Sequence, residues 1–140
     1  MRRGRTLRRA AALAAAFTLF MVGTARADGF IDQTHILVHA SPGTRVAPDT
    51  TVTISGELRA DHAFCRIDTA VNLRMFGDHG TPGGLVDTTK TASGGRFSFT
   101  VAVTEQTRFR VWFRGKVGGV HPDIKTCRKN RSRVVTIFMN

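Results

Sequence analysis

The most reactive side chains in the sequence are two cysteines, each with a histidine nearby. His62 precedes Cys65 by three residues, and His121 precedes Cys127 by six. Two cysteines and two histidines can bind a zinc ion, but neither half has the tight Cys-x2-Cys spacing of zinc sites. If the chain is exported, an even number of cysteines instead indicates a disulfide. We therefore predict a Cys65–Cys127 disulfide and no metal site.

Other catalytic chemistry has little support in the sequence. Serine, histidine and aspartate residues occur without the local motif that surrounds a catalytic nucleophile. The acidic residues include no pair that we can assign as the acid and base of a glycosidase. Residues 77–84 form a glycine-rich loop, but it lacks the lysine and the strand-to-helix context of a phosphate-binding loop. We predict a protein that is not an enzyme and needs no cofactor.

A second group of candidate residues is basic and aromatic. In residues 107–115, Phe109, Val111 and Phe113 alternate with polar and basic residues, which predicts a strand with one buried face. The opposite face would hold arginine beside tryptophan, which suits cation–π contacts and the binding of phosphates or carboxylates. The alternative is a solvated face on which a loop covers the tryptophan. The candidate binding residues are Arg74, Arg108, Arg110, Trp112, Arg114, Lys125, Arg128, Lys129 and Arg131.

The first 27 residues have the pattern of a signal peptide. Five arginines precede an apolar run at residues 10–23, and Ala25-Arg26-Ala27 fits the cleavage site of signal peptidase. A transmembrane anchor is the alternative, but spanning a bilayer takes about 20 apolar residues. We predict cleavage before Asp28, secretion or attachment to the cell envelope, and no membrane span in the mature chain. The formal charge falls from +11 to about +5, and Asp123 is the single acidic residue in the basic stretch 108–133.

Seven short strands are predicted in the mature domain, residues 28–140. Period-two alternation and intervening turn signals indicate strands at residues 34–41, 50–58, 71–76, 85–91, 95–103, 107–115 and 133–139. In the third strand the alternation predicts that Val71, Leu73 and Met75 point inward. Residues 60–64 are predicted as a loop and residues 116–131 as an irregular stretch. No segment has helical periodicity, so the fold class is all-β, and the number and spacing of strands favour a β-sandwich.

Several of these strands resemble those of bacterial immunoglobulin-like domains. The similar segments are V-T-I-S-G-E-L (52–58), V-N-L-R-M-F (71–76), T-T-K-T-A-S-G-G-R-F-S-F-T-V (88–101), T-R-F-R-V-W-F-R-G (107–115) and V-V-T-I-F (134–138). The resemblance implies a seven-stranded immunoglobulin-like β-sandwich, with strands at residues 34–40, 50–58, 69–76, 84–90, 96–103, 107–114 and 133–139. It also implies that Cys65 and Cys127 lie in two loops at the same end of the domain. The chain has no tyrosine and no core tryptophan in the third strand, unlike antibody domains.

These features predict a secreted, non-catalytic binding domain. Its basic face would contact an anionic cell-wall polymer or an acidic protein. Nucleic acid is electrostatically suitable, but export disfavours it. One alternative is a small-molecule carrier of the neocarzinostatin type, although such carriers have two short-range disulfides. The other is a purely structural module of the cell envelope.

Overall fold

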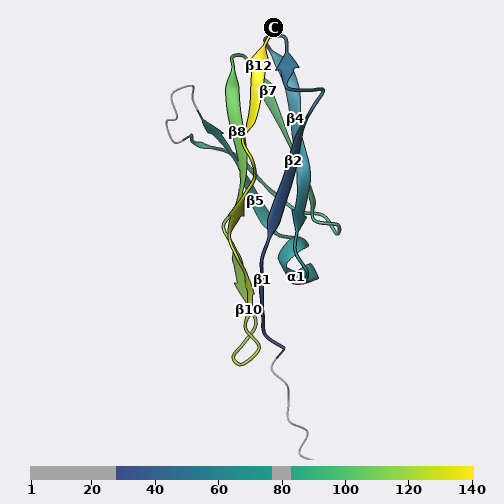
Figure 1. The fold of residues 1–140 in the computed structure, drawn as a ribbon, viewed down its shortest axis with the longest axis vertical. Coiled ribbons are helices and arrows are strands. Elements are labelled where there is room, and N and C mark those ends of the chain that lie inside the picture. The colour runs from purple at the N-terminus through teal and green to yellow at the C-terminus, as the bar shows by residue number, and fades with distance from the viewer. Residues whose placement is uncertain (1–27, 77–82) are drawn as a thin grey trace, which may run out of the picture.

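The computed structural model describes residues 28–76 and 83–140 (Figure 1). Within these residues the protein is all-β, with one helical turn, α1 (Ala63–Arg66). The predicted signal peptide and most of the predicted glycine-rich loop lie outside the described residues. None of the described helical structure has the length and apolarity needed to cross a bilayer.

One sheet contains three antiparallel strands in the order β2 (His35–Ser41), β4 (Thr50–Arg59) and β7 (Arg96–Val103). The central strand β4 pairs along most of its length with both neighbours, so that Ile54 lies between Ala40 and Phe99. The alternation predicted from the sequence is present, because Val52 and Ile54 are fully buried between more exposed threonine and serine residues.

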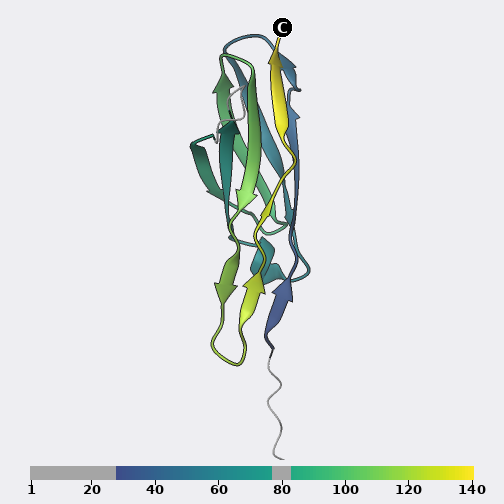
Figure 2. The same cartoon turned by 60° about the vertical axis from the view of Figure 1, so that its left-hand side comes forward.

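The second large sheet has the order β3 (Arg45–Val46), β12 (Val135–Met139), β8 (Thr107–Phe113), β5 (Ala70–Phe76) and β6 (Leu85–Lys90). A two-residue strand, β11 (Asn130–Arg131), also pairs with β8. Each of the seven predicted ranges contains a strand, with ends that differ by at most two residues. Figure 2 shows the strands of both large sheets running along the long axis of the molecule.

Both large sheets contribute to a single hydrophobic cluster. Phe99 and Leu58 come from the first sheet, and Leu73 and Val111 come from the second. Met75 lies opposite the buried Phe109 in the pairing of β5 with β8, so it is on the predicted inner face, but it is 45% exposed and does not join the core. The pairing of β5 with β6 shifts register between Leu73 and Arg74, whereas the pairing of β5 with β8 continues without a shift to Phe76.

A small third sheet extends from the end of the domain opposite the C-terminus (Figures 1 and 2). Its order is β1 (Phe30–Asp32), β10 (Lys125–Cys127) and β9 (Lys116–Gly118), with β1 parallel to β10. The predicted irregular stretch 116–131 therefore contains three short strands, and α1 begins within the predicted loop 60–64. Strands of two or three residues are too short to produce a period-two signal in the sequence.

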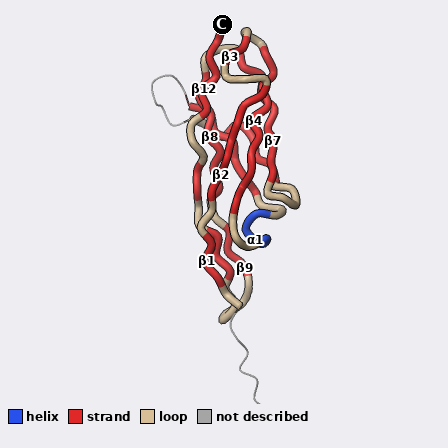
Figure 3. The backbone as a smooth tube through the Cα atoms, turned by 45° about the vertical axis from the view of Figure 1, so that its right-hand side comes forward, coloured by secondary structure: helices blue, strands red, loops and turns tan. Residues whose placement is uncertain are grey.

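A disulfide joins α1 to the small sheet, as the cysteine count predicted. Cys65 lies in α1 and Cys127 ends β10, with their Cα atoms 5.6 Å apart. Figure 3 shows α1 close to the ends of β4 and β7, where the large sheets approach the small one. Since both sulfur atoms are bonded to each other, the alternative zinc site has no thiolate ligands. The disulfide is consistent with an extracellular location.

Candidate binding surface

Strand β8 alternates strictly between buried and half-buried residues. Phe109, Val111 and Phe113 are buried in the core, whereas Arg108, Arg110 and Trp112 are half-buried on the opposite face. This is the arrangement that period-two alternation predicted. A β-strand points successive side chains to opposite faces of its sheet, so Arg108, Arg110 and Trp112 share one outer face.

Two neighbouring strands extend this outer face. In the pairing of β5 with β8, Arg74 lies opposite Arg110 and Asn72 lies opposite Trp112. On the other side of β8, Arg131 of β11 also lies opposite Trp112. We use the term basic face for Arg74, Arg108, Arg110, Trp112, Arg114, Lys129 and Arg131.

Trp112 lies between two guanidinium groups. The Cζ atom of Arg74 is 4.9 Å from the centre of the indole ring, and that of Arg131 is 5.9 Å from it. The two arginines approach from β5 and β11, which lie on opposite sides of β8. Each contact is a cation–π interaction, which fixes a guanidinium plane while leaving N–H groups at its edge for other acceptors.

The basic face includes a groove of about 690 Å³. Five predicted binding residues line it together with Phe113 and Asn130: Arg74, Trp112, Arg114, Lys129 and Arg131. A smaller hollow of about 160 Å³ is lined by Phe76, Arg108, Arg110 and Val134. Among the described residues, the lining of these two hollows contains no acidic side chain.

Several donors on the basic face lack acceptors. The Nε atoms of Arg74 and Arg110 and the Nε1 atom of Trp112 are buried without a hydrogen-bond partner in the described part of the chain. The ion pairs found within residues 28–76 and 83–140 join Arg59 to Glu57, His62 to Asp32 and Lys90 to Asp68, and none includes these donors. An unpaired buried donor costs about 1–3 kcal/mol, so a ligand acceptor or water there would be stabilising.

Two predicted binding residues lie elsewhere. Lys125 belongs to β10 and places its Nζ atom 5.7 Å from the ring centre of Phe64. Arg128 is exposed after β10, and its backbone N–H donates to the carbonyl of Asp32. Because the segment around Cys127 pairs with β1, both residues belong to the small-sheet region and neither lines the groove.

The region around the disulfide contains a second polar and aromatic cluster, which sequence reasoning did not find. Phe30 stacks on His62 with ring centres 3.6 Å apart, and Phe64 meets Phe30 edge-on. Lys116 lies over Phe64 at 4.4 Å and donates to the Phe64 carbonyl. These residues are far apart in the sequence and follow no shared motif. The cluster packs β1 and the small sheet onto α1.

Asp32 is the acidic member of this cluster. Burial by itself would raise the pKa of the Asp32 carboxyl, but hydrogen bonds from the backbone and ring of His62 lower it. Electrostatic attraction from the His62 ring, when that ring is charged, and from the Arg66 guanidinium also lowers the pKa of Asp32, and the net result is a pKa below the ordinary value. Asp32 and His62 form a hydrogen-bonded polar pair. Within the described residues, no hydroxyl or thiol side chain that could act as a nucleophile is hydrogen-bonded to this pair.

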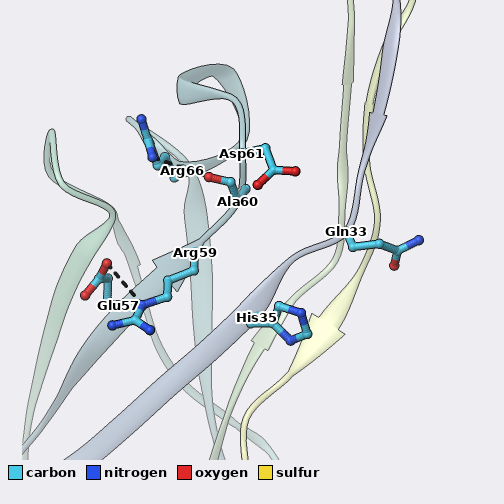
Figure 4. Close-up of a pocket in the computed structure, with 7 residues that line it drawn as sticks. All are labelled: Gln33, His35, Glu57, Arg59, Ala60, Asp61 and Arg66. Atoms are coloured by element: carbon cyan, nitrogen blue, oxygen red, sulfur yellow. Dashed lines mark hydrogen bonds and ion pairs between the residues drawn. The ribbon is translucent and has the colours of Figure 1, made fainter.

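A further hollow of about 390 Å³ differs from the groove in charge (Figure 4). Its lining combines acidic and basic residues: Gln33, His35, Glu57, Arg59, Ala60, Asp61 and Arg66. Arg59 pairs with Glu57 at 3.4 Å. The charges in this hollow largely cancel, which leaves the basic face as the stronger candidate for recognition of a charged ligand.

Comparison of the sequence with known protein families finds no matching family model, and comparison with curated proteins finds no similar sequence.

Proposed function

We propose that the protein is an exported, non-catalytic binding domain with an immunoglobulin-like β-sandwich architecture. The two sheets with strand orders β2-β4-β7 and β3-β12-β8-β5-β6, which contribute to one hydrophobic cluster, support this architecture. The disulfide and the signal-peptide pattern of residues 1–27 support export.

The proposed ligand is an anionic cell-wall polymer, bound along the basic face. The observation that carries this proposal is the Arg74–Trp112–Arg131 stack, whose guanidiniums have no carboxylate partner among the described residues. Arginine forks bind phosphate and carboxylate oxygens in two-point contacts. Trp112 orients these forks and contributes no charge of its own.

The shape of the basic face favours an extended ligand over a single small anion. Alternate residues of a strand are about 6.6–6.8 Å apart, so Arg108, Arg110 and Trp112 form a row along β8. The groove at Trp112 continues towards Arg114 and Lys129. A polymer with regularly repeated negative charges would meet several cations in succession, whereas a free anion would meet one or two.

Binding of the purified exported protein to immobilised polyphosphate and polyuronate tests this proposal. The double variant R74E/R131E, which reverses both cations beside Trp112, is expected to weaken binding at least tenfold. The matched control R59E/R96E changes the same number of charges on β4 and β7, and it should weaken binding less than threefold. Equal loss in both variants would show that only net charge matters and would contradict a defined face.

The same experiment separates the proposed polymer from other ligands. Selective, salt-sensitive binding to an acidic protein, with neither polymer bound, would overturn the polymer as ligand. A small molecule retained through purification and insensitive to R74E/R131E would instead support a carrier. Absence of binding to all probes at low salt would leave a structural role and contradict the proposal.

A further inference from the structure

The first described residues are docked against the loop between β9 and β10. The backbone nitrogen of Asp28 donates to a side-chain oxygen of Asp123 at 2.7 Å. Two residues later, the N–H of Phe30 donates to the carbonyl of Ile124 at 3.1 Å. The parallel pairing of β1 with β10 begins at the same residue, Phe30. The chain is therefore held from Asp28 onward.

Gly29 permits this close contact. A Cβ atom at this position would lie 2.7 Å from the carbonyl oxygen of Ile124 and 3.2 Å from that of Pro122. Both atoms belong to the backbone, so any larger residue would push the N-terminal segment away from the loop. The hydrogen bond of Asp28 and the small size of Gly29 thus support the same docked arrangement.

The docked nitrogen is also the atom that the predicted processing step would release. Signal peptidase would add water across the Ala27–Asp28 peptide bond, leaving a carboxylate on Ala27 and an amine on Asp28 that takes up a proton. We propose that the resulting α-ammonium group pairs with the Asp123 carboxylate, so that the β9–β10 loop is a receptor for the mature N-terminus.

Processing changes the strength of this contact. Before cleavage the nitrogen is a neutral amide with a single N–H, whereas afterwards it is a cation with three donors. Charge-assisted hydrogen bonds are roughly twice as strong as neutral ones. Within residues 28–31 and 119–125, the charged or titratable groups other than the Asp123 carboxylate and the new α-ammonium group are the Asp28 side chain, His121 and Lys125.

The contact continues into the disulfide region. Phe30 stacks on His62, and the next residue but one, Asp32, accepts hydrogen bonds from His62. Docking of the new N-terminus would therefore hold β1 against α1 and the Cys65–Cys127 bond. This inference depends on cleavage before Asp28 and is independent of the proposed polymer binding.

The first test is the mass of the protein exported by a bacterial host from the full-length gene, which should correspond to a chain beginning at Asp28. A second test uses chains beginning at Asp28 or at Ala27, each with and without Asp123→Asn. The rate of acylation of the α-amino group at neutral pH reports whether that group is paired. Asp123→Asn should accelerate acylation at least threefold in the chain that begins at Asp28 and less than 1.5-fold in the longer chain.

Two further variants test whether the acylation rate depends on the docked arrangement and on the position of the acidic residue. Gly29→Ala retains Asp123 but should also accelerate acylation in the chain that begins at Asp28, because it displaces the segment. Asp61→Asn, an exposed acidic residue outside the small sheet, should have no effect. Equal acceleration by Asp123→Asn in both chains, or an exported chain that begins at another residue, would overturn the proposal.

Discussion

The carboxylate of Asp32 accepts two hydrogen bonds from His62, one from the backbone N–H at 2.7 Å and one from ring atom Nδ1 at 2.8 Å. Asp32 is almost completely buried, whereas half of the His62 side chain is exposed. His62 immediately precedes α1, so this pair joins β1 to the start of the helix. An ionised carboxylate only accepts hydrogen bonds, which places a proton on Nδ1.

Asp32 should make the protein sensitive to acid. Its pKa is lowered in the folded state, so its contribution to stability is complete above the unfolded pKa of about 3.9 and is lost as pH falls through the folded value. Asp32→Ala should reduce the free energy of unfolding by about 2 kcal/mol at pH 7, and by less at pH 2. Urea unfolding at both pH values measures this difference. An equal loss at both would contradict the role of the ionised carboxylate.

Removal of the disulfide should destabilise the domain strongly. Cys65 and Cys127 are separated by 62 residues. On the chain-entropy model, closing a loop of this length stabilises the fold by about 4 kcal/mol. We expect the double variant C65S/C127S to lose about this amount in chemical unfolding. The wild-type protein should lose a similar amount after reduction, and a loss below 1 kcal/mol in both would show that the bond adds little.

Gly56 should tolerate no side chain. It lies in the middle of β4, opposite Val38 and Phe97 in the two neighbouring strands. An added Cβ would lie 1.9 Å from the Leu37 carbonyl oxygen and 2.8 Å from the Phe97 ring. We expect Gly56→Ala to destabilise the protein by about 2–3 kcal/mol, measured by thermal unfolding. Gly43→Ala is the control, because a Cβ there meets nothing within 4 Å.

Trp112 should act on binding through the two arginines beside it. Trp112→Ala removes the ring that orients Arg74 and Arg131, and it should weaken polyphosphate binding about three- to tenfold while the net charge stays the same. Trp112→Phe keeps an aromatic face and should restore much of the affinity. If Trp112→Phe binds polyphosphate as weakly as Trp112→Ala, that result would contradict the claim that an aromatic ring at this position orients Arg74 and Arg131 through cation–π contacts.

The large sheets were predictable because their strands are long enough to show alternation. Phe97 and Phe99, for example, are buried between exposed Ser98 and Thr100. The basic and apolar sides of β8 followed from the same rule. The rule also placed Met75 on the inner face beside Phe109, but alternation alone did not indicate that Met75 would be exposed near the end of β5.

The small sheet was not predictable in this way. Its strands have three residues each, and β1 pairs with β10 across more than ninety residues of chain. Long-range pairing of this kind depends on tertiary contacts and not on local pattern. For this reason the sequence supports Lys125 and Arg128 as candidate binding residues by their charge alone, and it contains no sign of the contact between Asp32 and His62.

The salt dependence of polyphosphate binding tests the central claim most directly. Cations that contact a polyanion displace its counterions, so the logarithm of the binding constant falls with the logarithm of the salt concentration. R74Q/R131Q should make this slope shallower by about 2, roughly 1 for each contact removed, whereas R59Q/R96Q should leave it unchanged. An unchanged slope in R74Q/R131Q, or the same reduction in both double variants, would contradict recognition through the arginines beside Trp112.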